Sequence, residues 1–288
     1  MLNLTHVRSF VAVTESGNYR DASRRLVCSQ PTVSQHIMKL EAVLDAVLVV
    51  RDRQRCSLTP EGKLFLPFAR SLLSVAERAQ NVLRDRVLSV GASGNIGTYL
   101  LQPFLQSFKE NLDGDVRIDV WIGPNPDVAE RLTNHEIDVG IMEWWDDRPH
   151  FTAMHWRQEP LVIIFPPDHP WAAKQSLDIE ELLDAPMIGG ETGSGTGRII
   201  RNVFGADADK LRVELQLGST EAVKHAVKAG LGVSLVMESA VREELRGGTL
   251  CARPLSGSDI KKQIYVVQQA DQPTLSLAPQ FAEHLINA

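Results

Sequence analysis

The segment from Asp21 to Glu41, DASRRLVCSQPTVSQHIMKLE, constrains the fold of this chain more than any other. Ala22 and Leu26 lie four residues apart and therefore share one face of a short helix. Ser29 is a typical helix N-cap, and the first helical turn after it tolerates Pro31. Two short helices joined by a polar turn are the layout of a helix-turn-helix, which places its second helix in the major groove of DNA.

The second helix of this motif has an apolar face and a polar face. Its inward positions are predicted to be Val33, Ile37, Leu40 and Leu44. The polar face carries groups that can reach base edges and phosphates. The candidate DNA-binding residues of the two helices are Arg24, Gln30, Pro31, Thr32, Ser34, Gln35, His36 and Lys39. The alternative is an amphipathic helix pair in a larger core with a solvated polar face.

A basic hairpin is predicted directly after this motif. Two short runs with β propensity, Leu48 to Val50 and Ser57 to Thr59, flank a turn that contains Arg51, Arg53 and Arg55. This arrangement is typical of a wing that lies along the phosphate backbone, so the three arginines are further candidate DNA contacts.

Charge is unevenly distributed along the 288 residues. Residues 1–86 contain 13 Lys and Arg against 8 Asp and Glu, whereas the remainder contains 17 against 28. This asymmetry indicates a DNA-binding head on a body that does not bind DNA. Because the net charge of one head is modest and affinity depends on the number of phosphates neutralised, we expect the protein to bind DNA as a dimer.

A long amphipathic helix is predicted from Thr59 to Arg86. Its apolar residues recur every three or four positions: Leu64, Phe68, Leu72, Val75, Ala79 and Val82. The helix either packs on its own domain or pairs with a second copy of the chain. No neighbouring segment is placed to cover the apolar face, which favours pairing.

From Val87 onward the pattern changes to strands alternating with helices, which predicts an α/β body with a largely parallel sheet. A single apolar helix is expected from Ile96 to Phe108. The strand candidates are 87–92, 116–122, 137–142, 161–165, 187–189, 212–217, 233–236 and 263–268.

The chain resembles the LysR-type transcriptional regulators over essentially its whole length. The matching residues are Ala22, Arg25, Leu26, Ser29, Gln30, Pro31, Val33, Ser34, Leu40, Glu41, Leu44, Arg51, Leu58, Thr59, Pro60 and Gly62. The sequence departs from the family at Asp45, usually glycine, and at Val47 and Val49, where proline and phenylalanine are common. The segments ETGSGT, residues 191–196, and 218–232 are similar to those of the family branch that contains sulfur-assimilation and carbon-fixation regulators.

This resemblance implies an α-rich, N-terminal winged helix-turn-helix and a C-terminal, two-lobed effector domain like a periplasmic binding protein. The implied domains are the DNA-binding domain 1–59, the dimerisation helix 60–86 and the effector-binding domain 87–288. Lobe I is expected to comprise 87–161 and 266–288, and lobe II 162–265. The implied partners are double-stranded DNA, a small-molecule effector, RNA polymerase and further copies of the chain in a homodimer or homotetramer.

Three turns before helices are candidates for binding the effector. The residues are Ser93, Gly94 and Asn95 in the first turn, Gly193, Ser194, Gly195 and Thr196 in the second, and Ser219 and Thr220 in the third. Taken singly, each is explained as a helix cap or tight loop. In the resembling family, the positions of these turns face the ligand. Together the turns present N–H groups and hydroxyls at the positive ends of helices, which predicts a small anion or carboxylate as the effector.

Glu143, Trp144 and Trp145 favour a different effector. A carboxylate with two indoles is able to bind an amine by charge and cation–π attraction, although the indoles are also explained as packing. An ionised Glu143 in the cleft would repel an anion unless a base such as Arg198 compensated it.

Other functional classes have less support in the sequence. The chain could be a stand-alone ligand-binding protein or a nucleotide-dependent enzyme, but neither function would explain residues 21–41. The sequence contains no dinucleotide fingerprint, P-loop or nucleophile elbow, so no catalytic residue is assigned. Cys28, Cys56 and Cys251 are isolated, which predicts no metal and no cofactor and fits a reducing compartment. Without a signal peptide or membrane-length apolar run, the expected location is the cytoplasm, with no membrane partner.

Overall fold

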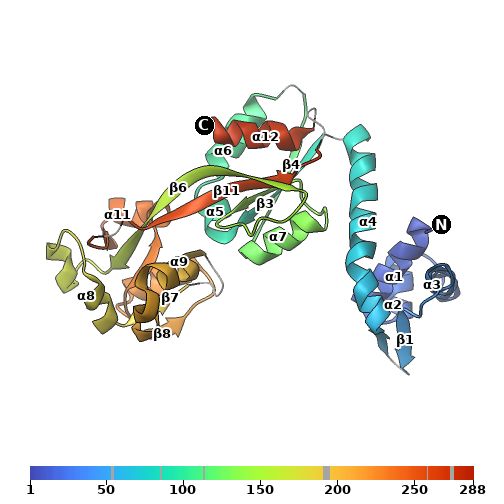
Figure 1. Ribbon diagram of the computed structural model, residues 1–288, viewed down its shortest axis with the longest axis horizontal. Coiled ribbons are helices and arrows are strands. Elements are labelled where there is room, and N and C mark those ends of the chain that lie inside the picture. Colours follow the sequence, from blue (N-terminus) through green and yellow to red (C-terminus); the bar gives the residue numbers. More distant parts are fainter. Residues whose placement is uncertain (53–54, 85, 113, 191–194, 258, 273–275) are drawn as a thin grey trace. The chain divides into compact units, whose positions relative to one another are not determined.

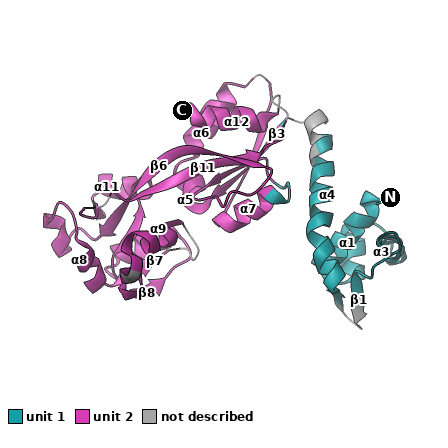
Figure 2. Cartoon of the chain, viewed as in Figure 1, with its two compact units in different colours: residues 1–86, 133–136 teal, residues 87–132, 137–288 magenta. Residues whose placement is uncertain are grey.

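The computed structural model describes residues 1–52, 55–84, 86–112, 114–190, 195–257, 259–272 and 276–288 (Figure 1). The chain divides into two compact units (Figure 2). We call residues 1–86, with which 133–136 are grouped, the head, and residues 87–132 and 137–288 the body.

The head contains four helices and a hairpin among its described residues. They are α1 (Leu4–Ser16), α2 (Tyr19–Arg25), α3 (Gln30–Leu44), β1 (Val49–Asp52), β2 (Arg55–Leu58) and α4 (Pro60–Arg84). Gly17 ends α1 in the left-handed conformation, at φ 67°, which glycine adopts without steric strain. Ser29 caps α3, and Pro31 lies in its first turn.

The core of the head lies where α1 packs against α3 and α2. Phe10 of α1 and Val33, Ile37 and Leu40 of α3 are buried, so three of the four inward positions predicted for α3 are confirmed. Leu44, the fourth, is half-buried and packs against the same cluster. These contacts fix which side of α3 remains exposed.

The predicted hairpin is confirmed, because β1 pairs antiparallel with β2 from Val49 opposite Leu58 to Asp52 opposite Arg55. Arg51 belongs to β1 and Arg55 to β2, while Arg53 lies outside the described residues.

The body begins with elements that build its first lobe. They are β3 (Val87–Ser93), α5 (Gly94–Tyr99), α6 (Gln102–Glu110), β4 (Arg117–Gly123), α7 (Asn125–Thr133) and β5 (Val139–Met142), joined by the C-terminal helix α12 (Leu277–Ile286). The long strand β6 (Phe151–Phe165) leads into the second lobe, and β11 (Lys261–Gln269) returns from it (Figure 1).

The second lobe comprises shorter elements. They are η1 (Pro170–Ala173), α8 (Ile179–Asp184), β7 (Met187–Gly189), α9 (Gly195–Phe204), η2 (Gly205–Lys210), β8 (Val213–Gln216), α10 (Thr220–Lys228), β9 (Ser234–Met237), η3 (Glu238–Val241), α11 (Arg242–Arg246) and β10 (Cys251–Arg253).

The main sheet is mixed, and the expectation of a largely parallel sheet is wrong. Its strand order is β10-β6-β11-β5-β3-β4, with β9 also paired to β6. Strand β3 pairs parallel with β4 and β5, whereas β11 pairs antiparallel with both β5 and β6. The chain crosses between the lobes in opposite directions, and this reversal accounts for the antiparallel pairs.

Two other sequence predictions for the body need correction. The single helix expected from Ile96 to Phe108 is two helices, because Pro103 lies in the first turn of α6 and has no N–H with which to continue α5. Strand β6 begins at Phe151, ten residues before the predicted start at Leu161. Its first half is only partly buried and therefore lacks a continuous apolar run.

Candidate functional site

The first turn of α3 is built by Ser29. Its hydroxyl accepts a hydrogen bond from the Thr32 amide at 3.2 Å and lies 2.7 Å from the Thr32 hydroxyl. This cap satisfies one of the backbone donors that a helix start leaves without an intrahelical partner. The cap and the buried face of α3 together hold its opposite face toward solvent.

The candidate DNA-binding residues on α2 and α3 differ in exposure. Gln30, Pro31, Gln35 and Lys39 are exposed, as is Arg24 on α2. Thr32, Ser34 and His36 are half-buried. The α3 groups thus form a polar face on an α-helix, an element that a major groove admits.

His36 is turned toward α1 instead of standing free on this face. Its Nδ1 lies 2.8 Å from the hydroxyl of the buried Ser9, and its ring centroid lies 4.9 Å from that of His6. Burial, together with the charges of His36 and Lys39, lowers the pKa of His6. These contacts give His36 a packing role in the head whether or not it touches DNA.

The hairpin is fastened to α3 by Glu41. Its carboxylate accepts the backbone N–H groups of Leu48 at 2.8 Å and Val49 at 3.2 Å. Gly62 fits closely beneath the same segment, where an added Cβ would lie 2.1 Å from the Leu48 carbonyl oxygen. Both residues were singled out in the sequence only by the family resemblance, and the structure supplies their physical reason.

One stripe of α4 is apolar and exposed. Leu64 is 72% exposed and Phe68 is 69% exposed, and Leu72 and Val75 continue the stripe at helical spacing. In the described part of the chain these side chains do not join the head core. An apolar stripe of this size on a long helix suits a partner helix.

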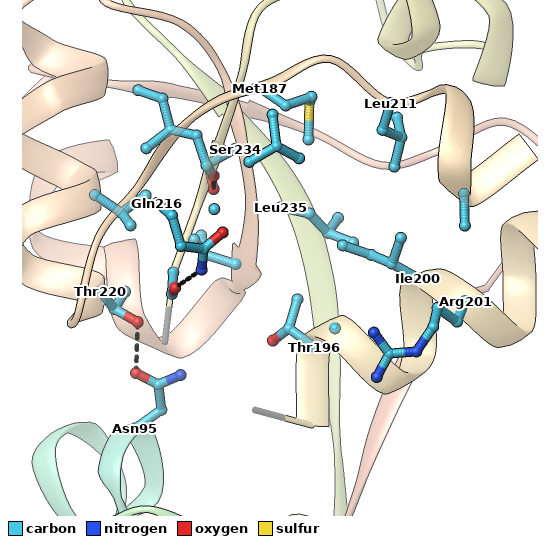
Figure 3. Close-up of a pocket in the computed structure, with 18 of the residues that line it drawn as sticks. Asn95, Met187, Thr196, Ile200, Arg201, Leu211, Gln216, Thr220, Ser234 and Leu235 are labelled. Carbon is cyan, nitrogen blue, oxygen red and sulfur yellow. Dashed lines mark hydrogen bonds between the residues drawn. The ribbon is translucent and has the colours of Figure 1, made fainter. Parts of the chain in front are cut away.

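The body contains a cavity of about 490 Å³ in the second lobe, between the sheet strands β7, β8 and β9 and the helix α9. Met187, Ile200, Leu211 and Leu235 provide an apolar interior (Figure 3). Its volume is within the range of small-molecule sites.

Polar residues from both lobes line this cavity: Asn95 at the start of α5, Thr196 at the start of α9, Gln216 at the end of β8 and Thr220 at the start of α10. Two exposed charged residues also line the cavity, the cationic Arg201 of α9 (Figure 3) and the acidic Asp209 of η2. The cavity thus combines an apolar interior with polar groups at helix starts, an arrangement that binds and orients a small polar molecule.

Hydrogen bonds of Thr220 and Tyr99 join the lobes beside the cavity. The Thr220 hydroxyl donates to Asn95 Oδ1 at 2.7 Å (Figure 3), and the Tyr99 hydroxyl donates to Glu221 Oε1 at 2.7 Å. Burial and the hydrogen bond to Glu221 raise the pKa of Tyr99, so the phenol stays protonated. The sequence patterns did not indicate Tyr99.

The three predicted turns occupy different environments. Asn95, Thr196 and Thr220 line the cavity. Ser93 is buried, and its hydroxyl lies 3.3 Å from the Ile141 carbonyl, while Ser219 caps α10 by accepting the Ala222 amide at 3.3 Å. Gly94 and Gly195 are the first residues of α5 and α9, and Gly193 and Ser194 lie outside the described residues.

Glu143 follows β5 and forms a buried ion pair. Its Oε1 lies 2.9 Å from Nζ of Lys262, and the two side chains are 4% and 0% exposed, respectively. Its Oε2 accepts the backbone N–H of Gly195 at 2.7 Å. The base that compensates Glu143 is therefore Lys262, whereas the guanidinium of Arg198 lies 4.3 Å from the ring centroid of Trp144.

The two indoles have separate roles. Trp145 packs edge-on against Phe151, with ring centroids 5.5 Å apart, in a cluster of the first lobe. Trp144 presents one face to Arg198. The carboxylate and one indole that favoured an amine are thus already paired with cations of the protein itself.

The described residues include no group of three or more His, Cys, Asp or Glu placed to hold a metal ion. Among them, no helix is both long and apolar enough to cross a membrane.

Comparison with known proteins identifies both parts of the chain. Residues 4–63 match the model of the bacterial regulatory helix-turn-helix protein, lysR family, and residues 83–288 match the LysR substrate binding domain. The PtxE protein of Stutzerimonas stutzeri, named as an HTH-type transcriptional regulator, is 44% identical over 196 residues, which is 68% of this chain and 100% of that protein.

Two further relatives extend the comparison. A protein of Cyanidioschyzon merolae named as a probable RuBisCO transcriptional regulator is 27% identical over 99% of this chain and 97% of its own length, which confirms the likeness to carbon-fixation regulators. The solved CcmR regulatory domain of Synechocystis PCC6803 in complex with 2-PG, 2-phosphoglycolate, is 26% identical with a TM-score of 0.63, covering 70% of this chain and 96% of that one. The chain therefore belongs to the LysR family of DNA-binding transcriptional regulators, which combine a helix-turn-helix head with an effector-binding body.

Proposed function

We propose that this regulator responds to a small organic anion, which binds in the body cavity at Asn95, Thr196 and Thr220. One observation carries the proposal: Asn95 and Thr196 each keep a hydrogen-bond donor that a ligand can use. Thr220 donates its hydroxyl proton to Asn95 Oδ1, so the Asn95 amide N–H groups remain for a ligand. Thr196 accepts from Lys262, so its own proton is also left to donate.

The same wall adds positive potential. Thr196 lies in the first turn of the ten-residue helix α9, whose N-terminal end attracts anions, and Arg201 lies one turn further along. The apolar interior suits a carbon-containing anion better than a bare inorganic ion. CcmR, with its bound 2-PG, is a family precedent for a ligand of this class. An amine has less support, because Glu143 and Trp144 are paired with Lys262 and Arg198.

The effector class is tested by thermal unfolding of the full-length protein with 2-phosphoglycolate, malonate, sulfate, sulfite and putrescine. A ligand at a hundred times its Kd stabilises the folded state by about 2.7 kcal/mol, which raises the melting temperature of the body. We expect stabilisation by an organic anion and none by putrescine. Stabilisation by putrescine alone would refute the assignment.

For the head, we infer that residues 1–59 bind DNA and that 60–86 form the dimerisation helix of a homodimer or homotetramer. Gln30, Thr32, Ser34 and Gln35 are proposed to read bases. Lys39 and the wing arginines are proposed to hold phosphates. We assign the protein no catalytic step, and because it is a DNA-binding regulator we place its action in the cytoplasm.

These roles predict opposite effects for two exposed residues of α3. Gln30→Ala should relax the preference at one base pair, by about 1–3 kcal/mol of discrimination. Lys39→Ala should weaken binding to all sequences alike and reduce the salt slope by about 1. Titrations of operator and unrelated duplexes at several salt concentrations separate the two, and equal behaviour of both variants would contradict the division of roles.

A further inference from the structure

A buried charge pair lies directly behind the cavity wall. Lys262 Nζ contacts Glu143 Oε1 at 2.9 Å and Thr196 Oγ1 at 3.0 Å. The other carboxylate oxygen of Glu143 accepts the Gly195 N–H at 2.7 Å. The pair therefore touches the first two residues of α9, one of which lines the cavity.

The carboxylate by itself would oppose an anionic ligand. Glu143 is packed so closely against Gly195 that an added Cβ there would lie 2.5 Å from Oε2. Its negative charge thus sits at the same helix end that is proposed to attract the effector, and only 4% of its side chain is exposed to screening solvent. If a bound monoanion lay about 7 Å from the uncompensated charge, at an effective dielectric constant of about 20, its binding would be weakened roughly fiftyfold.

Lys262 removes this obstacle in two ways. Its positive charge cancels that of Glu143, so the pair contributes no net charge to the wall. An ammonium group has donors and no acceptor, so its contact with Thr196 fixes the hydroxyl oxygen as acceptor and leaves the hydroxyl proton for another partner.

We infer that Lys262 is the specificity-determining residue that makes the effector cavity accept anions, acting through Glu143 and Thr196. This inference rests on the proposed function, since it concerns the effector of the same cavity. Lys262 is a positioning and charge-compensating residue, and no direct contact with the effector is required of it.

Three variants of the full-length protein test the inference, with binding of 2-phosphoglycolate measured by calorimetry. Lys262→Met keeps the aliphatic stem but leaves Glu143 uncompensated, so affinity should fall at least tenfold. Glu143→Gln keeps an acceptor for Gly195 but leaves Lys262 uncompensated, so affinity should rise severalfold. The double variant restores neutrality and should regain most of the loss.

Lys261→Met is the matched control. Lys261 is adjacent on β11 but has a half-exposed side chain that pairs with Asp259, so its replacement should change affinity less than about twofold. Circular dichroism and tryptophan fluorescence check that each variant is folded. If Lys262→Met does not fold, the comparison of Glu143→Gln and the double variant with wild type decides, because replacing both members of a buried pair is often tolerated.

The outcomes separate the inference from the proposed function. If wild type binds no anion of the panel, both fall together. If wild type binds 2-phosphoglycolate and Lys262→Met binds it equally well, the inference alone is overturned. It is also overturned if Lys262→Met loses binding and the double variant recovers none, because compensation of Glu143 would then not explain the role of Lys262.

Discussion

Replacing Val27 by glycine is expected to stabilise the head. Val27 adopts φ 51°, a left-handed conformation that is rare for a β-branched residue. The hydrogen bonds around it explain why: the Val27 amide donates to the Arg24 carbonyl at 3.2 Å and the Cys28 amide to the Ser23 carbonyl at 3.0 Å. This is the Schellman pattern that ends a helix, in which the residue at the position of Val27 is usually glycine.

The gain is the difference between two opposing effects. An L-residue in the left-handed region is destabilised by roughly 1–2 kcal/mol. Glycine removes this strain but loses about 0.5–1 kcal/mol more conformational entropy on folding. The side chain of Val27 is 91% exposed, so its removal sacrifices almost no burial. We therefore expect Val27→Gly to increase the free energy of unfolding by about 0.5–1 kcal/mol.

Hydrogen exchange of the core amides of α3 in the full-length protein measures this change without interference from the body. For amides that open only with the head, exchange should slow roughly two- to fivefold. Val27→Ala is the control, because alanine keeps the Cβ that causes the strain and should gain much less. Equal protection in all three proteins, or faster exchange in the glycine variant, would refute the account of strain at this turn.

Three further predictions concern the head. Phe68→Asp should raise the dimer dissociation constant by roughly a hundredfold or more, since burial of one such ring contributes roughly 1.5–3 kcal/mol and a dimer contains two. Sedimentation equilibrium measures the dissociation constant, and Lys63→Asp, at an exposed position of the same helix, is the control. Gly62→Ala should destabilise the head by about 1–3 kcal/mol, because its Cβ would lie 2.1 Å from the Leu48 carbonyl oxygen; unchanged urea unfolding would contradict this. The lowered pKa of His6 means that the folded head favours the neutral ring. This contribution to stability is therefore complete above pH 6.5 and is lost as the pH falls through the folded pKa. His6→Gln should flatten the dependence of the free energy of unfolding on pH, measured by urea unfolding between about pH 5 and about pH 8.

The architecture of the head follows from short-range signals. These signals act within a few residues of one another, so they can be recognised from the sequence alone. They are the Ser29 cap, Pro31 in the first turn and the spacing of Val33, Ile37 and Leu40. The turn before α3 is different. Valine gives no local signal of the left-handed conformation that Val27 adopts, which accompanies the hydrogen bonds that end α2.

In the body, the sequence placed most strands and the helix starts of the effector site, but not the sheet directions. The long strand β6 was missed in its first half, where partial burial weakens the alternation of apolar and polar residues. The predicted turns supplied Asn95, Thr196 and Thr220 to the cavity, while Tyr99 and Arg201 lie in helices and carry no local signal.

The sequence by itself determined the helix-turn-helix, its exposed polar face and the α/β character of the body, because caps and periodicity are local properties. Only the tertiary structure decided how Glu143 is neutralised. Lys261 and Lys262 are adjacent and chemically identical, and successive residues of a strand point to opposite faces. The register of β11, which sets Lys262 opposite Glu159 of β6, determines that Lys262 is buried beside Glu143 while Lys261 faces solvent.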